Sequence, residues 1–184
     1  MSSDPPIEDP SPQAEPSVSD TALAALIRER GEPLLEGLET QLPGSAERAE
    51  AIGAYALATA VGLGFERAEA DLWRQTARLA NSGKIYSPEG SHQEAGARLA
   101  RGAGIPGVVC DWLLRAQERY DGSGPGGLSG AEIPVFSRII RTSVRCDELI
   151  TAGALPTAMK ELSGTELDPN MVDALASMLE RAAT

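Results

Sequence analysis

The chain has 184 residues, enough for one domain with its own hydrophobic core and too few for a multidomain assembly. Its 27 acidic and 16 basic side chains give a net charge of −11, which repels a phosphate backbone and argues against nucleic acid as a main partner. A single histidine, His92, excludes a histidine-rich metal centre. The two cysteines lie in apolar helical patterns, no secretory leader opens the chain, and no apolar run reaches the ~20 residues of a membrane span. A reduced, cytoplasmic protein without membrane contact is expected.

Residues 1–20 contain five prolines and five acidic side chains and no basic one. Such a segment cannot continue a helix or present an apolar face, so a disordered tail is expected. Residues 21–44 follow as an N-terminal helical extension, in which Gly31 and Pro33 predict a break between two short helices. The main domain is expected over residues 45–184.

Apolar residues recur at helical spacing through this domain. Ser45 predicts one helix start and the Asp168-Pro169 pair another, because Asp caps a helix and Pro fits its first turn. No alternating, β-branched segment bounded by turns occurs, so the expected fold class is all-α, with roughly seven to nine helices. The expected helices cover 45–62, 66–80, a segment opening at 91 with a capping box, 106–119, a segment from 133 through 144, and 171–181.

Two glycine-containing stretches have structural as well as functional interpretations. The loop 121–130 could bring backbone N–H groups against a phosphate, but the Lys-Ser/Thr pair and the preceding strand of a P-loop are absent, which favours a simple helix-joining loop. The stretch Asn81 to Lys84 follows a helix and is interpreted as its C-terminal stop. Gly83 would then take the left-handed conformation, and Lys84 would favour the helix dipole.

The order of these segments carries a family resemblance. Residues 118–134 read ERYDGSGPGGLSGAEIP and are followed by SRII, which is similar to the HHERxDGxGYPxGLxGxxIPxxARII signature of HD-GYP domains. Upstream, LANSGKI at 79–85 resembles the family's LHDxGKI, SHQEAG at 91–96 resembles its HPxxG, and 48–56 resembles its HxxRVxxYA. The resemblance covers residues 45–184. It implies an HD-domain-like helical bundle, whose active members hydrolyse cyclic di-GMP at a two- or three-metal site.

Most of the metal ligands that the family uses are missing from this chain. His92 is the one residue that matches a family ligand. The other ligand positions fall on Arg48, Ala80, Asn81, Ala116, Gln117 and Val144. Ala and Val offer no lone pair and the two amides are weak neutral ligands, so we expect no metal, no cofactor and no catalytic residue. The resemblance thus implies a pseudoenzyme that keeps the fold and has lost the metal centre.

The resemblance also marks residues that could still function. Lys84 matches the lysine that contacts substrate phosphate in active members. The candidates for a residual ligand pocket are Lys84, His92, Arg119 and Asp121. The GYP tripeptide, implicated in partner contacts in the family, is reduced here to Gly124, Pro125 and Gly126, which form a candidate interaction loop.

The leading hypothesis is a catalytically inactive HD-GYP-like domain that acts as a regulatory protein-interaction module in bacterial cyclic di-nucleotide signalling. Its partners would be signalling proteins, and a homo-oligomer stays open. One alternative is a cyclic di-GMP receptor that binds the nucleotide without hydrolysing it. The other is a phosphodiesterase with a rearranged metal site built from His92, Glu118, Asp121 and Asp147.

Overall fold

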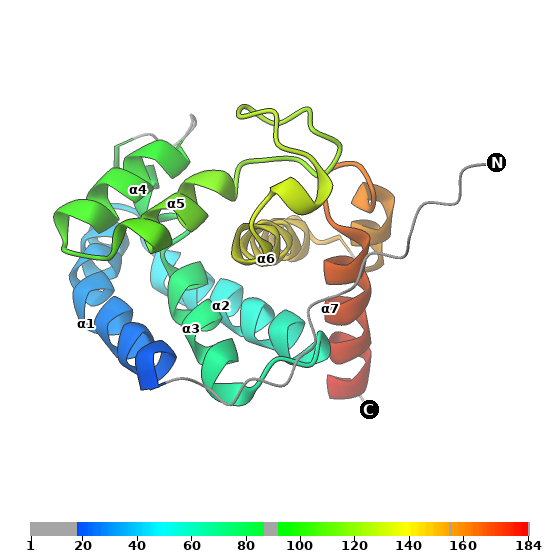
Figure 1. The fold of residues 1–184 in the computed structure, drawn as a ribbon, viewed down its shortest axis with the longest axis horizontal. Coiled ribbons are helices and arrows are strands. Elements are labelled where there is room, and N and C mark those ends of the chain that lie inside the picture. Colours follow the sequence, from blue (N-terminus) through cyan, green and yellow to red (C-terminus); the bar gives the residue numbers. More distant parts are fainter. Residues whose placement is uncertain (1–17, 87–91, 155, 184) are drawn as a thin grey trace.

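The apolar pattern folds the chain into a bundle of helices around one central helix, α6 (Figure 1). The computed structural model describes residues 18–86, 92–154 and 156–183, and these residues contain helices and no strand. The all-α prediction is confirmed. The elements are α1 Val18–Gln41, α2 Ser45–Gly62, α3 Arg67–Arg78, η1 Ser82–Ile85, α4 His92–Gly102, α5 Gly107–Arg115, η2 Gly130–Glu132, α6 Val135–Thr151, η3 Pro156–Leu162 and α7 Pro169–Ala182, where η marks a 3-10 helix.

Helix α1 runs unbroken through the position where two short helices were expected, so that prediction is wrong. Pro33 lies inside the helix, and Gly31 faces α3 so closely that a Cβ there would lie 2.8 Å from Leu79 Cδ2. Burial of Ile27 and Leu35 against the bundle outweighs the one backbone hydrogen bond that a proline removes. Residues 18–20, expected in the tail, form the first turn of α1, and the rest of that tail lies outside the described residues.

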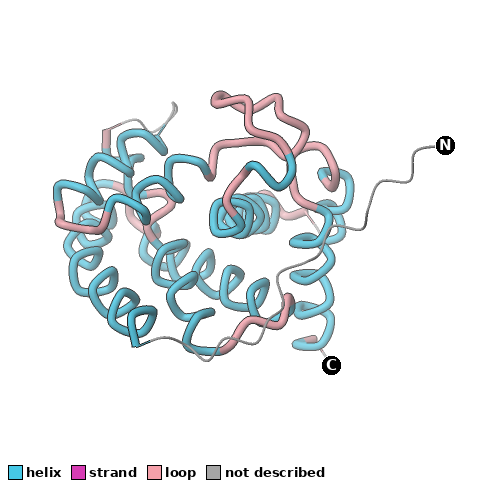
Figure 2. Tube along the Cα trace, viewed as in Figure 1, coloured by secondary structure: helices cyan, strands magenta, loops and turns pink. Residues whose placement is uncertain are grey.

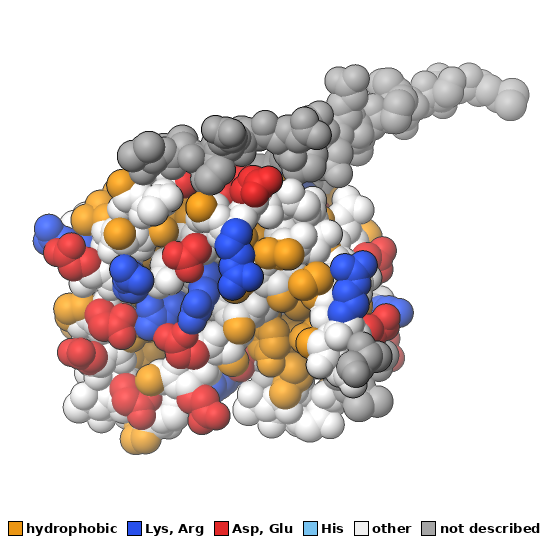
Figure 3. Space-filling view, turned by 90° about the horizontal axis from the view of Figure 1, so that it is seen from below, with side chains coloured by type: hydrophobic (Ala, Val, Ile, Leu, Met, Phe, Trp, Pro, Cys, Tyr) orange, Lys and Arg blue, Asp and Glu red, His pale blue; other side chains and the backbone are white. Residues whose placement is uncertain are grey.

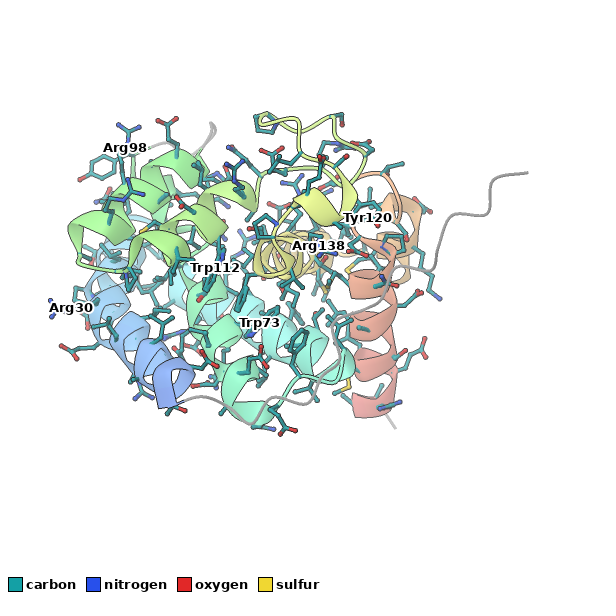
Figure 4. All side chains as sticks on the ribbon, viewed as in Figure 1. Arg30, Trp73, Arg98, Trp112, Tyr120 and Arg138 are labelled. Atoms are coloured by element: carbon teal, nitrogen blue, oxygen red, sulfur yellow. The ribbon has the colours of Figure 1, made fainter. Side chains whose placement is uncertain are left out.

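The centre of the molecule lies where α2, α3 and α6 meet. Trp73 of α3 is buried between Phe65 and Phe136, with ring centroids 4.5 and 3.7 Å away, and Phe136 stacks on Trp112 at 3.9 Å. Figure 4 shows Trp73 and Trp112 inside the helical frame. These four rings join α3, α5 and α6, which fixes the elements on which the site is built.

The C-terminal helix α7 starts as the sequence predicts. Asp168 Oδ1 accepts a hydrogen bond from the Asn170 N–H at 2.8 Å, and Pro169 occupies the first turn. Asp168 is also ion-paired with Arg138 of α6. The helix packs on α2 near Gly62, where a Cβ would lie 2.9 Å from the Ala174 carbonyl oxygen.

Several helix boundaries differ from the predicted ones. The predicted capping serine of α4 lies outside the described residues. Helix α5 begins after Pro106 and ends at Arg115 instead of near residue 119, and α6 begins at Val135. The chain between α5 and α6 is the long irregular segment in Figure 2, and it contains the glycine-rich loop. Among the described residues, no helix is long and apolar enough to cross a membrane.

Candidate functional site

The short helix η1 brings the segment Asn81 to Lys84 to the end of α1 and the start of α2. Gly83 has no positive φ, so the predicted left-handed stop is wrong. A Cβ on Gly83 would instead overlap the His92 carbonyl oxygen and the Gly96 backbone nitrogen of α4. Glycine is therefore required for close contact between η1 and α4, and this contact holds Lys84 in place.

Arg48 and Asp147 form the ion pair that crosses this region. Arg48 lies in the second turn of α2, and its Nε and Nη2 donate hydrogen bonds to Asp147 Oδ2 of α6 at 2.8 and 2.6 Å. The Asp147 side chain is only 6% exposed, whereas that of Arg48 is 37% exposed. A buried carboxylate thus fixes one edge of a guanidinium whose other edge stays accessible.

A cavity of about 260 Å³ opens beside this ion pair. Arg48, Asn81 and Lys84 line it together, from α2 and from the start of η1. Its other walls come from the α1–α2 corner, namely Leu38, Leu42, Pro43, Gly44 and Ser45. The structure thus brings together three residues that sequence reasoning singled out separately.

Lys84 is the unneutralised charge of this cavity. It forms no ion pair within 4.0 Å of a described carboxylate, and its side chain is half-buried. Burial lowers the pKa of Lys84 and the nearby Arg48 lowers it further, while Glu148 and Asp147 act in the opposite direction. Because burial and a like charge both disfavour the ammonium form, a bound anion would be stabilising here.

The N-terminus of α2 contributes little to this positive charge. The Glu39 carboxylate accepts hydrogen bonds from the backbone N–H groups of Gly44 and Ala46 at 3.0 and 2.8 Å. These bonds lower the pKa of Glu39. The helix is capped from within, so the charge of the cavity comes from the side chains of Arg48 and Lys84.

Two buried polar atoms beside Lys84 lack a hydrogen-bond partner among the described residues. They are Asn81 Oδ1 and Ser82 Oγ. Asn81 is 6% exposed and lines the cavity. A buried acceptor without a donor is unfavourable, so Asn81 suits a ligand that brings a donor group.

The other predicted pocket residues lie elsewhere. Arg119 donates from Nε to Ser123 Oγ at 2.8 Å and contacts Glu166 at 3.4 Å, and Asp121 accepts from the Ser123 N–H at 2.9 Å. Neither residue lines the cavity with Arg48 and Lys84. His92 opens α4, with its Nε2 3.3 Å from Gln93 Nε2, and its carbonyl group packs on Gly83.

The side chains at the positions that the HD-GYP resemblance assigns to metal ligands do not fit a pair of divalent metals. Ala80 and Ala116 are buried in the apolar core, and Val144 packs against it. Asn81 and Gln117 carry neutral amides, and Asp147 is held by Arg48. In the described part of the chain, no three His, Cys, Asp or Glu side chains lie close enough to hold a metal ion. His92, Glu118, Asp121 and Asp147 therefore do not form the rearranged metal site.

The interaction loop is held in place by Glu118, which lies upstream of it in the chain. The buried Glu118 accepts a hydrogen bond at Oε1 from the Gly126 N–H at 2.8 Å. A Cβ on Gly124 would lie 2.7 Å from Glu118 Oε2, and a Cβ on Gly126 would overlap Oε1. Pro125, between them, is exposed. These glycines are structural, because the loop wraps around a buried carboxylate.

Sequence reasoning missed the Arg48–Asp147 pair and the role of Glu39. The paired residues are 99 positions apart, and no local pattern joins them. One signal was available. Asp147 follows Cys146 on the buried side of the helix, where a charged residue needs a partner.

Comparisons with known proteins identify the fold. No protein-family model matches the chain, and no curated protein matches its sequence. The structure is similar to that of Bd1817, an HDG"Y"P protein from Bdellovibrio bacteriovorus, with a TM-score of 0.64 and 17% identity over 88% of this chain and 69% of that one. It is also similar to the phosphodiesterase PgpH HD domain of L. monocytogenes, solved in complex with cyclic-di-AMP, with a TM-score of 0.59 and 16% identity over 82% of this chain and 97% of that one.

A third structure belongs to the cyclic GMP-AMP specific phosphodiesterases of V. cholerae, V-cGAP3. Its TM-score is 0.58 and its identity 19%, over 89% of this chain and 49% of that one. This chain therefore spans about half the length of the V. cholerae structure. The chain therefore shares the helical fold of these HD domains.

These comparisons correct the prediction that the chain is not an enzyme. Two of the three solved structures are named as phosphodiesterases, so this fold occurs in enzymes. The prediction rested on the missing metal ligands, which belong to one site, and activity is a property of a whole site.

Proposed function

We propose that this chain, with its HD-domain superfamily fold, works in cyclic nucleotide signalling by binding the phosphate of a cyclic nucleotide in the cavity between α1, α2 and η1. One observation carries the proposal: Arg48 and Lys84 line the same cavity, and no described carboxylate pairs with Lys84. The names of the solved structures support the ligand class, since they refer to cyclic-di-AMP and to cyclic GMP-AMP.

The chemistry of the cavity suits a phosphodiester. Ammonium and guanidinium groups form charge-assisted hydrogen bonds with phosphate oxygens, each contributing roughly 1.5–3 kcal/mol. A recessed position in a cavity of about 260 Å³ strengthens such bonds relative to a flat surface. The cavity accepts a phosphate and its sugar, while the bases of a dinucleotide would extend along the surface.

A larger groove, of about 580 Å³, lies between α1 and α4 and is a weaker candidate. Its walls are mainly apolar, with Leu34, Tyr86 and Leu99 among them, and Arg98 is the one cation among the described residues that line it. It therefore lacks the converging charges that hold a phosphate.

The test compares the chain's two lysines, Lys84 and Lys160. Lys160 is exposed on η3 and serves as the matched control. We expect calorimetric titration to show binding of a cyclic dinucleotide by the wild type, at least tenfold weaker binding by Lys84→Ala, and unchanged binding by Lys160→Ala. Turnover is measured in the same samples, so that cleavage is scored apart from binding. Equal affinities for the wild type and Lys84→Ala would contradict the proposal.

A second candidate function is protein interaction through the loop 121–130. The loop is organised before any partner arrives, because Asp121 N–H donates to the Thr165 carbonyl at 2.9 Å and Gly130 N–H donates to the Tyr120 carbonyl at 2.9 Å. An ordered, exposed loop loses little entropy on binding. Pro125→Arg should then remove a specific signalling partner that Ala25→Arg, an exposed change on α1, retains.

A further inference from the structure

We infer that Arg48 and Lys84 supply, as fixed side-chain charges, the positive charge that divalent metals would bring to a phosphodiester, so that this chain recognises its ligand without a metal. The inference rests on the proposed function and names how that site is charged. It starts from the disagreement described above between the fold family's metal site and the donors that this chain presents.

The ion pair with Asp147 makes Arg48 a fixed charge. Both hydrogen bonds from Arg48 end on the same oxygen, Oδ2, and Asp147 is buried on α6. The carboxylate therefore sets the plane of the guanidinium before any ligand arrives. No described residue accepts a hydrogen bond from Arg48 Nη1, which leaves that nitrogen available to an oxygen in the cavity.

The charges that face Arg48 and Lys84 leave one positive charge over, while the Glu39 carboxylate at the rim offsets the N-terminus of α2. Arg48 and Lys84 contribute two, and Asp147 removes one. Glu148, which also lies near Lys84, is ion-paired with Arg145. A phosphodiester carries a single negative charge, so it would neutralise the site. The two side chains therefore neutralise one phosphodiester without the positive charge of a metal ion.

Asn81 keeps this excess charge from being cancelled. It lines the cavity beside Lys84 with a neutral amide. An aspartate at the same place would differ by one negative charge at nearly constant volume, and it would cancel the excess positive charge of the cavity. Asn81→Asp is therefore a test of the charge balance that leaves the shape of the cavity alone.

The experiment is a calorimetric titration with cyclic di-GMP, performed once in EDTA and once with added manganese. We expect the wild type to bind with affinities within about twofold of each other in the two buffers. Arg48→Gln and Asn81→Asp should each weaken binding at least tenfold in EDTA. The control is Arg115→Gln, because Arg115 is exposed at the end of α5 and lines neither the cavity nor the groove between α1 and α4, and binding by this variant should be unchanged.

Each outcome separates the inference from the proposed function. Binding that requires manganese would overturn the metal-free site and leave nucleotide binding standing. The absence of binding in both buffers would overturn the proposed function itself. Circular dichroism tests whether Arg48→Gln folds. If it does not fold, Asn81→Asp alone tests the charge balance, because this variant leaves the Arg48–Asp147 pair in place. Undiminished binding by Asn81→Asp would contradict the charge balance.

Discussion

At the scale of single residues, Lys84 carries a conflict between stability and binding. Its ammonium group is half-buried next to Arg48, and both burial and that like charge lower its pKa. Such placements are unfavourable in the folded protein and are retained where a ligand uses the charge. The Arg48–Asp147 pair, in contrast, stabilises the folded protein, because it supplies a partner for a buried carboxylate. The same contact orients the Arg48 guanidinium.

Removing the Lys84 charge should stabilise the fold. The pKa of Lys84 in the folded protein is below its usual 10.5, so the unfolded chain binds more protons than the folded one between the two pKa values. Stability therefore rises with pH across that window. At neutral pH Lys84 is charged, and its charge destabilises the folded state. We expect Lys84→Met to raise the Tm by about 1–2 °C at neutral pH. The variant should also lack the increase in stability that the wild type shows between the two pKa values.

Differential scanning calorimetry over a pH series measures this effect, with Lys160→Met as the exposed control. A lower Tm for Lys84→Met at neutral pH would show that Lys84 has a favourable partner in the fold.

Local sequence could not reveal these residue-scale features. Lys84 was predicted as a pocket residue, whereas Asn81 was identified only as a position where a metal ligand is lost, and the structure places both on one cavity. Arg48 was identified only as a position where a ligand is lost. Its partner Asp147 lies on another helix, and pairing across 99 residues depends on how α2 and α6 pack, which no local spacing encodes.

At the scale of elements, backbone contact between η1 and α4 positions the site. Gly83 touches the His92 carbonyl and Gly96, so the two elements approach closer than side chains allow. The sequence predicted the existence of most helices, because apolar spacing and caps are local. It failed at Gly31 and Pro33, where burial against Leu79 overrides the local tendency to break a helix.

Gly83→Ala should therefore separate η1 from α4. The added methyl group would overlap backbone atoms, which cannot rotate away as a side chain can. We expect a loss of about 2 kcal/mol or more in the free energy of unfolding, measured with urea.

The matched control is Gly102→Ala at the end of α4, where a Cβ meets nothing within 4 Å. It should be neutral or stabilise by up to about 1 kcal/mol. Similar stabilities for Gly83→Ala and the wild type would mean that η1 and α4 can move apart freely.

At the scale of the whole molecule, one core supports both the site and the loop. The aromatic rings of Phe65, Trp73, Phe136 and Trp112 join α3, α5 and α6, and α6 carries Asp147. On the face shown in Figure 3, acidic and basic side chains are interspersed, so the net charge of −11 does not form one uniform field there. Local charge at the cavity can therefore differ in sign from the total.

Trp73→Ala should destabilise the whole bundle, because the side chain is 1% exposed and lies between two rings. We expect a loss of about 3–5 kcal/mol in the free energy of unfolding, a large fraction of the ~5–15 kcal/mol of an ordinary domain. Urea unfolding followed by circular dichroism measures it. A loss below about 1 kcal/mol would show that the ring stack is not central to the fold.

The most direct measurement of the central claim is a crystal structure of the protein with a bound cyclic dinucleotide. The account predicts one phosphate in the cavity at Arg48 and Lys84, with its oxygens within hydrogen-bond distance of Arg48 Nη1 and Lys84 Nζ. The Arg48–Asp147 pair stays intact, and Asn81 Oδ1 accepts from a donor group of the nucleotide and not from the phosphate. A nucleotide bound in the groove between α1 and α4, or held at another place by a metal ion, would contradict it.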